Sequence, residues 1–110
     1  MEDLHERLAT ARRLIKNQLR HHVTSAKVAE DPTWDSVAFV NQTALRNARE
    51  DWHKLPSWAG TRDELVCLIL DALREATQQV QEDFREHFPV AWLDKHLGDY
   101  LEAFQPEDLL

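Results

Sequence analysis

The fold of this chain is decided by residues 61–88, which read TRDELVCLILDALREATQQVQEDFREHF. Thr61, with Glu64 three positions later, is the capping-box pattern that begins a helix. Behind it, apolar residues return every three or four positions, the spacing of one helix face: Leu65, Leu68, Ile69, Ala72, Leu73, Ala76, Val80, Phe84 and Phe88. The segment predicts one long helix over residues 61–88, which must end before Pro89.

The same periodicity predicts two helices on the N-terminal side. The first, over residues 1–30, is indicated by a stripe of six apolar residues: Leu4, Leu8, Ala11, Ile15, Leu19 and Val23. The second, over residues 31–54, would begin with Asp31 as its N-cap and Pro32 in its first turn. Its apolar face would consist of Trp34, Val37, Ala38, Leu45, Ala48 and Trp52.

Prolines mark the remaining boundaries. Residues 55–60, which contain Pro56 and Gly60, predict a loop. Pro89 begins a shorter helix over residues 89–105, with an apolar stripe of Leu93, Leu97, Tyr100, Leu101 and Phe104. Residues 107–110 are expected to form a frayed tail.

Turn-forming residues are scarce, with two glycines and four prolines in 110 residues. A many-stranded β protein would need a turn signal about every 8–12 residues. The sequence therefore predicts an all-α protein with a single helical domain over residues 1–110. A four-helix antiparallel bundle, with three long helices and a shorter C-terminal one, would bury all four stripes.

The composition favours a cytoplasmic protein without a membrane partner. Cys67 is the only cysteine, so no intrachain disulfide can form. The first residues are acidic, unlike the basic and apolar regions of a secretory signal. The longest apolar run has six residues, Leu65 to Leu70, whereas a membrane helix needs about 20.

Charge is distributed unevenly along the chain, whose net charge is −7. Residues 51–110 carry five basic and thirteen acidic side chains, whereas six basic side chains and no acidic one lie between Arg7 and Ala29. This basic run contains no aromatic residue for base stacking, and the acidic remainder repels a polyanion, so nucleic acid is not an expected partner. We expect the basic run to be solvated, or to contact acids such as Glu75, Glu82, Asp83 and Glu86 within the bundle or in a second copy.

Most catalytic and metal chemistries lack their residues. Two isolated glycines cannot form a phosphate-binding loop, and Cys67 lies in the most apolar segment, where a packed core thiol is favoured over a nucleophile. Asp83 and His87, with His96, are the nearest approach to a zinc site, but a surface pair is favoured. The sequence predicts no cofactor, no metal site and no catalytic residue.

One enzymatic alternative has named residues. The segment Arg46-Asn47-Ala48-Arg49-Glu50-Asp51-Trp52-His53 resembles the Arg-x(4–6)-His signature of the HEPN family of helical ribonucleases. The resemblance implies that Arg46 and His53 from two subunits would act on RNA across a dimer interface. The resemblance covers eight residues.

The apolar run within residues 61–88 predicts a homodimer. A helix that is apolar around its whole circumference must be buried on all sides, whereas each helix of a four-helix monomer normally keeps one side in water. Either the preceding loop caps this turn or a second copy covers it, and the second is favoured. The predicted dimer interface consists of Leu65, Val66, Leu68, Ile69, Leu70 and Leu73.

Three of the four tryptophans fall within 25 residues, near the predicted loop. Tryptophan is enriched at binding hot spots, which predicts a partner-binding surface formed by Trp34, Phe39, Val40, Trp52, Leu55 and Trp58. The alternative, that these rings close the end of the bundle, stays open at this point.

Together these patterns predict a small non-catalytic regulatory or inhibitory protein, which binds another protein and sterically blocks it. Its size and acidity are similar to those of small bacterial inhibitors such as immunity proteins and anti-activators, an analogy at the level of class. The acidic half of the chain would speed the encounter with a target that has a basic surface.

Overall fold

The computed structural model describes residues 4–37 and 39–110, and these residues form helices and turns without a strand. The helices are α1 (Leu4–Glu30), α2 (Gln42–Lys54), α3 (Arg62–Phe84) and α4 (Val90–Ala103), followed by a 3₁₀-helix η1 (Pro106–Leu109). The predicted all-α, four-helix architecture is confirmed. Residues 1–3 and Ala38, which the sequence assigned to the first two helices, lie outside the described residues.

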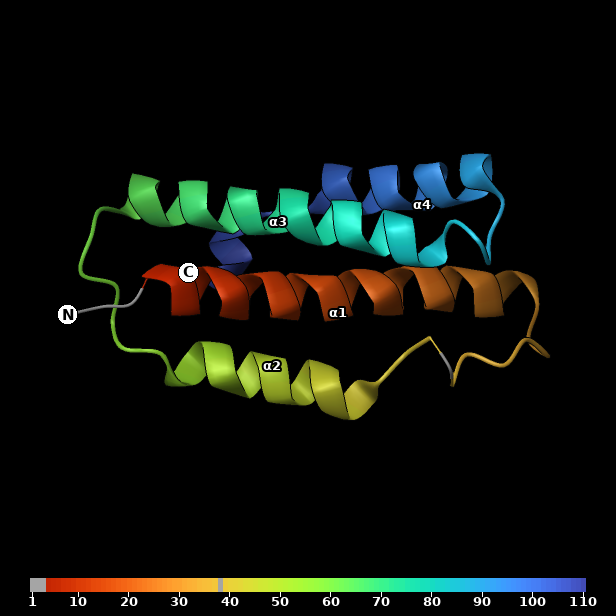
Figure 1. The fold of residues 1–110 in the computed structure, drawn as a ribbon, viewed down its shortest axis with the longest axis horizontal. Helices are drawn as coiled ribbons and strands as arrows, with labels where there is room; N and C mark the ends of the chain where they lie inside the picture. The colour runs from red at the N-terminus through yellow and green to blue at the C-terminus, as the bar shows by residue number, and fades with distance from the viewer. Residues whose placement is uncertain (1–3, 38) are drawn as a thin grey trace.

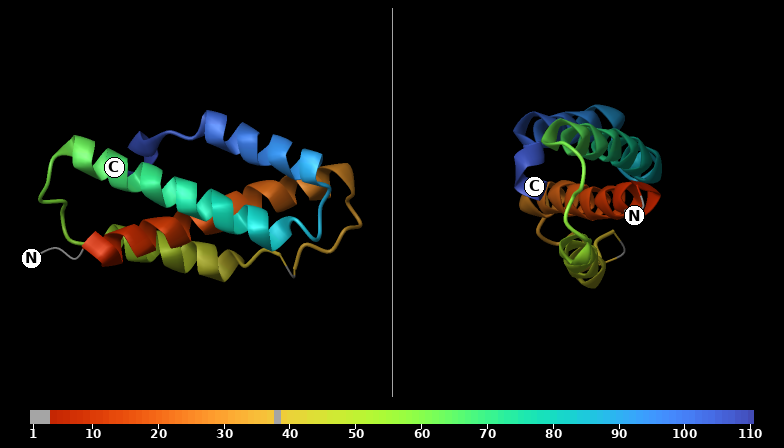
Figure 2. Two further views of the ribbon diagram at one scale, coloured as in Figure 1. Left: turned by 45° about the horizontal axis from the view of Figure 1, so that its top comes forward. Right: turned by 90° about the vertical axis from the view of Figure 1, so that its left-hand side faces the viewer.

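Helix α1 runs through the middle of an elongated molecule of 47 × 25 × 20 Å. Helices α2 and α4 run antiparallel to α1, whereas α3 lies beside α1 and runs in the same direction (Figure 1). Helix α1 contacts all three other helices, and α3 also contacts α4 and η1. Among the α-helices of the described residues, α2 packs against α1 alone. Seen down the long axis, α2 stands apart from the α3–α4 side (Figure 2).

The core follows α1 in two clusters. At the end where α1 begins, Ala11, Leu14 and Ile15 pack against buried residues of α2 and α3. At the other end, Leu19 and Val23 pack against an apolar set from α3, α4 and the turn between them: Val80, Phe84, Phe88, Leu93 and Leu97. The helical stripes read from the sequence supply both clusters.

The predicted start of the second helix is wrong by about ten residues, because polar side chains hold the preceding segment in turns. Asp31 accepts hydrogen bonds from the backbone N–H and hydroxyl of Thr33, and Asp35 accepts one from the N–H of Val37. The N-cap is Asn41, whose side chain accepts from the N–H of Ala44 at 2.9 Å. Local bonds of this kind compete with helix formation.

Two other boundaries also differ from the prediction. Helix α3 ends at Phe84, and the turn that follows lets Phe88 fold back against Phe84, with ring centroids 5.4 Å apart. The expected frayed tail is the 3₁₀-helix η1, and Leu109 packs against the first core cluster. Helices α1 and α3 have 27 and 23 residues, whereas α2 and α4 have 13 and 14. The bundle therefore has two long and two short helices.

No helix in residues 4–37 and 39–110 is long and apolar enough to cross a membrane.

Candidate protein-binding groove

Arg7 joins the loop between α2 and α3 to the start of α1. Its guanidinium carbon lies 5.6 Å from the ring centroid of Trp52 and 5.3 Å from that of Trp58. An Arg7 nitrogen also donates a hydrogen bond to the carbonyl of Pro56. Arg7 is 5% exposed and Trp52 is 7% exposed. A cation held between two rings and bonded to a loop carbonyl fixes residues 55–60 against α1.

Trp58 is half-buried and closes the turn that precedes α3. Its indole N–H donates a 2.6 Å hydrogen bond to the carbonyl of Thr61. A Cβ added at Gly60 would lie 2.8 Å from the Trp58 ring and 2.6 Å from a carboxylate oxygen of Glu64. The glycine therefore lets the indole lie against the turn, where the ring forms one end of a groove.

This groove, of about 630 Å³, runs between the first turns of α1 and the first turns of α3. Leu4 and Leu8 form its α1 wall, and Cys67 and Leu68 form its α3 wall. Leu4 is 57% exposed, and Cys67 is exposed rather than packed in the core as its apolar neighbours suggested. Three acidic residues and one histidine complete the lining: Asp63, Glu64, Asp71 and His5.

The groove exists because α2 does not cover the α1–α3 contact. In a regular bundle a neighbouring helix lies over such a contact, but here α1 is the one α-helix of the described residues against which α2 packs. Further along the same face, Arg12 and Glu75 form a 3.0 Å ion pair between α1 and α3. The apolar part of the trough is therefore bounded by Trp58 at one end and by this ion pair at the other.

Comparisons with protein-family models, with curated proteins and with solved structures found no match for this chain.

The residues predicted to form one partner-binding surface lie at two ends of the molecule. Trp34 and Phe39, from the segment between α1 and α2, stack at 5.0 Å, and Phe39 meets Phe84 and His87 edge-on. They are half-buried, as is Val40, and they cover the second core cluster. Trp52, Leu55 and Trp58 belong instead to the first core cluster or pack against it, and the loop at residues 55–60 lies at the opposite end of the molecule (Figure 1). Of the six residues, only Trp58 lines the groove.

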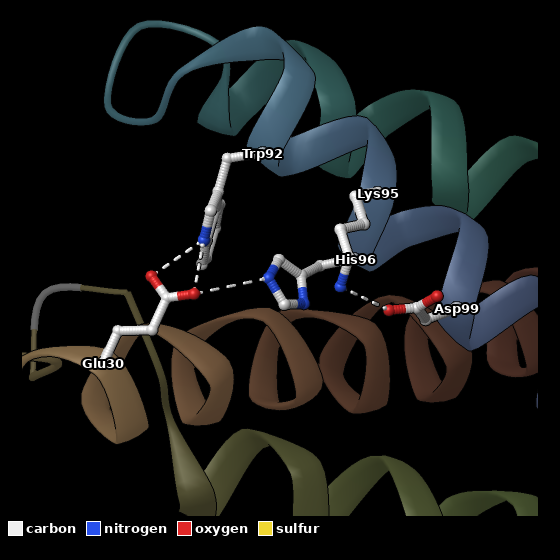
Figure 3. A network of polar contacts seen from close by, with 5 residues as sticks. All are labelled: Glu30, Trp92, Lys95, His96 and Asp99. Atoms are coloured by element: carbon white, nitrogen blue, oxygen red, sulfur yellow. Dashed lines mark hydrogen bonds and ion pairs between the residues drawn. The ribbon is translucent and has the colours of Figure 1, made fainter.

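The fourth tryptophan, Trp92, ties α4 to the end of α1. Its indole N–H donates to both carboxylate oxygens of Glu30, at 3.0 and 2.9 Å (Figure 3). The His96 ring lies 4.3 Å from the Trp92 ring, and its Nε2 is 3.9 Å from the same carboxylate. In the same view Lys95 and Asp99 pair one turn apart within α4.

The six residues predicted to form a dimer interface divide between core and surface. Leu65, Ile69 and Leu73 are buried within one subunit. Val66 and Leu68 are half-buried, and Leu70 is 44% exposed. Leu70 lines a second, smaller groove together with Leu101 of α4, which is 41% exposed. The apolar run from Leu65 to Leu70 is therefore buried on the side that faces the core. It is open on two other sides, one at the groove beside Cys67 and one at the smaller groove beside Leu70.

Most of the basic run on α1 is engaged within the subunit. Arg12 pairs with Glu75, and Arg13 lies 2.7 Å from Asp51 of α2. Lys16 and Arg20 both lie 3.5 Å from the carboxylate of Asp83. From the sequence, we expect the basic run to contact acids either within the bundle or in a second copy. Glu75 and Asp83, two of the acids named from the sequence, make these contacts within the bundle.

The zinc arrangement considered from the sequence does not assemble. Asp83 faces Lys16 and Arg20, His87 contacts the Phe39 ring, and His96 points toward Glu30. Within the described residues, no group of three or more His, Cys, Asp or Glu side chains is placed to hold a metal ion.

Arg46 and His53 are both exposed on α2. Seven residues on an α-helix amount to almost two full turns, so the two side chains share a face.

Tyr100 joins α4 to the middle of α1. Its hydroxyl donates to the Gln18 side chain at 3.3 Å, and the His22 ring meets its ring edge-on at 5.5 Å. Burial raises the pKa of Tyr100 to about 12, since the phenolate would lose its hydration there.

The sequence did not identify Leu4, Leu8 or the acidic border as parts of a site. The available signal was the all-round apolar run, which indicated surplus apolar surface on α3. Which of its sides stays uncovered depends on where α2 packs, and no local pattern encodes that position.

Proposed function

We propose that this protein is a non-catalytic regulator that binds another protein and sterically blocks the surface it covers. The observation that carries the proposal is the groove between α1 and α3, where leucine side chains remain open to solvent beside Trp58. Exposed apolar surface bordered by polar groups is typical of a protein-binding site. Immunity proteins and anti-activators are the class of inhibitor to which this proposal assigns the chain.

The mechanism is occlusion. Apolar side chains of the partner enter the groove, and the bulk of the bundle then covers neighbouring surface of the partner. The net charge of −7 attracts a partner with a basic surface and raises the rate of encounter.

The test uses Cys67, because it is the only cysteine and it lines the groove. A benzophenone maleimide attached to Cys67 should form a photo-crosslink to the partner in extracts of the native host, and the purified protein should lower that partner's activity. The matched control is Cys67→Ser with Val37→Cys, which moves the label to a residue that is 81% exposed. A crosslink of equal yield from position 37, or a captured protein whose activity is unaffected, would contradict the proposal.

A homodimer is proposed through the opposite edge of α3. Leu70 and Leu101 of α4 line the smaller groove there, and the half-buried Val66 lies one turn before Leu70 on α3. The buried residues Leu65, Ile69 and Leu73 support this surface from within the subunit.

The alternative proposal is a HEPN-like ribonuclease. It is supported by the exposure of Arg46 and His53 on one face of α2, where two copies of α2 could bring them together. RNA cleavage by the purified protein that is lost in both Arg46→Ala and His53→Ala would favour this alternative over occlusion. Unchanged RNA after prolonged incubation would remove it.

A further inference from the structure

We infer that the groove takes one amphipathic α-helix of the partner, and that this helix carries lysine or arginine on the flank that faces α3. The inference deepens the proposed function and rests on it, because it names the chemistry of the segment that binds.

The shape of the groove is that of a trough between two parallel helices. From Asp63 to Asp71, α3 rises about 12 Å, whereas the apolar positions i, i+4 and i+7 of a bound helix span about 10.5 Å. Side chains of a third helix fit the furrow between two packed helices, and helix-in-groove binding uses anchors at this spacing. The groove therefore has room for about two turns of a bound helix.

The apolar walls are placed to receive such anchors. Leu4 and Leu8 are four residues apart, so their side chains stand one turn apart on the same face of α1. Leu68 and Cys67 face them from α3. Trp58 closes one end, and the Arg12–Glu75 ion pair replaces apolar contact at the other. A helix that binds here meets apolar surface only along these two turns.

The border of the groove selects the charge of the bound helix. Asp63, Glu64 and Asp71 are all exposed along the α3 wall. Neither Asp63 nor Glu64 forms an ion pair with another described residue, and Asp71 pairs only with Arg74, at 3.4 Å. Arg62, the nearest base in sequence, lies 3.7 Å from Glu107. Basic side chains about seven residues apart on the bound helix can reach both ends of this acidic border.

A buried small-molecule ligand is the less favoured occupant. Such sites enclose most of the ligand surface, whereas this groove is open along its outer side and has an exposed leucine, Leu4, in one wall.

The experiment is a selection with a displayed peptide library on the full chain. The library consists of helices of about 16 residues, or four turns, with leucine fixed at i, i+4 and i+7 and both flanks varied among Lys, Glu, Gln and Ser. We expect lysine to be enriched over glutamate on one flank only. The enriched peptide should slow alkylation of Cys67, because a bound helix covers that thiol.

Three variants make the result specific. Cys67→Lys places a charged side chain within the groove and should weaken binding by about tenfold or more. Val37→Lys adds the same charge at the far end of the molecule and should leave binding within twofold. Asp63→Asn with Asp71→Asn should reduce both the affinity and its dependence on salt, because screened charge attraction is lost.

The outcomes separate the inference from the proposed function. No enrichment, enrichment of glutamate, or a selected peptide that binds Cys67→Lys as well as the natural chain would overturn the inference. If Cys67 still crosslinks a partner whose activity falls, the proposed function stands while the helix assignment fails. If both experiments are negative, both fail.

Discussion

The indole N–H of Trp52 donates a 3.0 Å hydrogen bond to the backbone carbonyl of Leu109, 57 residues further along the chain. The bond joins the buried face of α2 to η1, which also packs against α3. Trp52 therefore holds α2 and η1 together inside the subunit. Its ring is buried and its N–H is already bonded, so neither is available to a partner.

Replacement of Trp52 by Phe should lower the free energy of unfolding by about 1 kcal/mol for the hydrogen bond, with a further loss for the smaller ring. The measurement is urea denaturation followed by circular dichroism. Removal of residues 106–110 should also destabilise the fold, and Trp52→Phe should then cost less, because its acceptor is already gone. Equal costs in both backgrounds would show that the bond contributes nothing.

Arg7→Lys should destabilise the protein by about 1–2 kcal/mol, because an ammonium cannot replace the planar guanidinium in its contacts with the rings of Trp52 and Trp58 and in its hydrogen bond to Pro56. The control is Arg12→Lys, whose side chain is 42% exposed in its ion pair. Arg12→Lys should change the free energy of unfolding by no more than about 0.5 kcal/mol. Thermal unfolding monitored by tryptophan fluorescence compares the two, and equal melting temperatures would contradict the role given to Arg7.

Asp83→Asn should cost more stability than Glu75→Gln. The Asp83 carboxylate neutralises two cations, Lys16 and Arg20, whose side chains are 25% and 23% exposed. Glu75 neutralises one cation in a pair about 40% exposed on both sides, where the gain is typically about 0–1 kcal/mol. Denaturant unfolding at low and high salt should show the larger salt dependence for the Asp83 interaction. A larger loss of stability in Glu75→Gln than in Asp83→Asn would contradict this prediction.

Stability should fall between pH 10 and pH 12 because of Tyr100. Its folded-state pKa is about 12 and its ordinary pKa is about 10, so in this window the unfolded chain loses the proton that the folded chain keeps. The contribution is fully present below pH 10 and is lost as the pH rises to 12. Tyr100→Phe should flatten this alkaline decrease by about 2 kcal/mol. Tyr100 is the only tyrosine, so phenolate absorbance measures its ionisation directly.

Leu70→Lys should convert the proposed homodimer into a monomer, because it places a charge in the centre of the apolar edge formed with Leu101. Val90→Lys, at a residue that is 61% exposed at the start of α4, is the matched control and should leave the dimer intact. Sedimentation equilibrium gives the mass in each case. A natural chain that sediments as a monomer at high concentration would end the homodimer proposal.

The helical architecture could be predicted because stripe spacing and caps are local signals. Thr61 accepts a hydrogen bond from the N–H of Glu64 at 3.2 Å, as the capping-box pattern indicated. The start of α2 could not be predicted from the same rules, since Asp31 followed by Pro32 fits a helix cap and a turn equally well. Val37, assigned to the apolar face of that helix, is 81% exposed.

The site was less predictable than the fold, for a physical reason. Aromatic composition indicated Trp52 and Trp58 as candidates, but only tertiary packing decides that the Arg7 guanidinium lies within 6 Å of both ring centroids. Cys67 has the same apolar neighbours in sequence as a core residue, yet it faces the side of α3 that α2 leaves open.

Among the α-helices in the described part of the chain, α2 packs against α1 alone, and the Trp52–Leu109 bond is its tie to η1, so α2 can separate from the bundle while α1, α3 and α4 stay packed together. Amide hydrogens of α2 should therefore exchange with solvent deuterium well before those in the middle of α1, through partial openings of the bundle. Because the walls of the groove belong to α1 and α3, such an opening leaves both walls in place, and a peptide bound there should not slow exchange in α2.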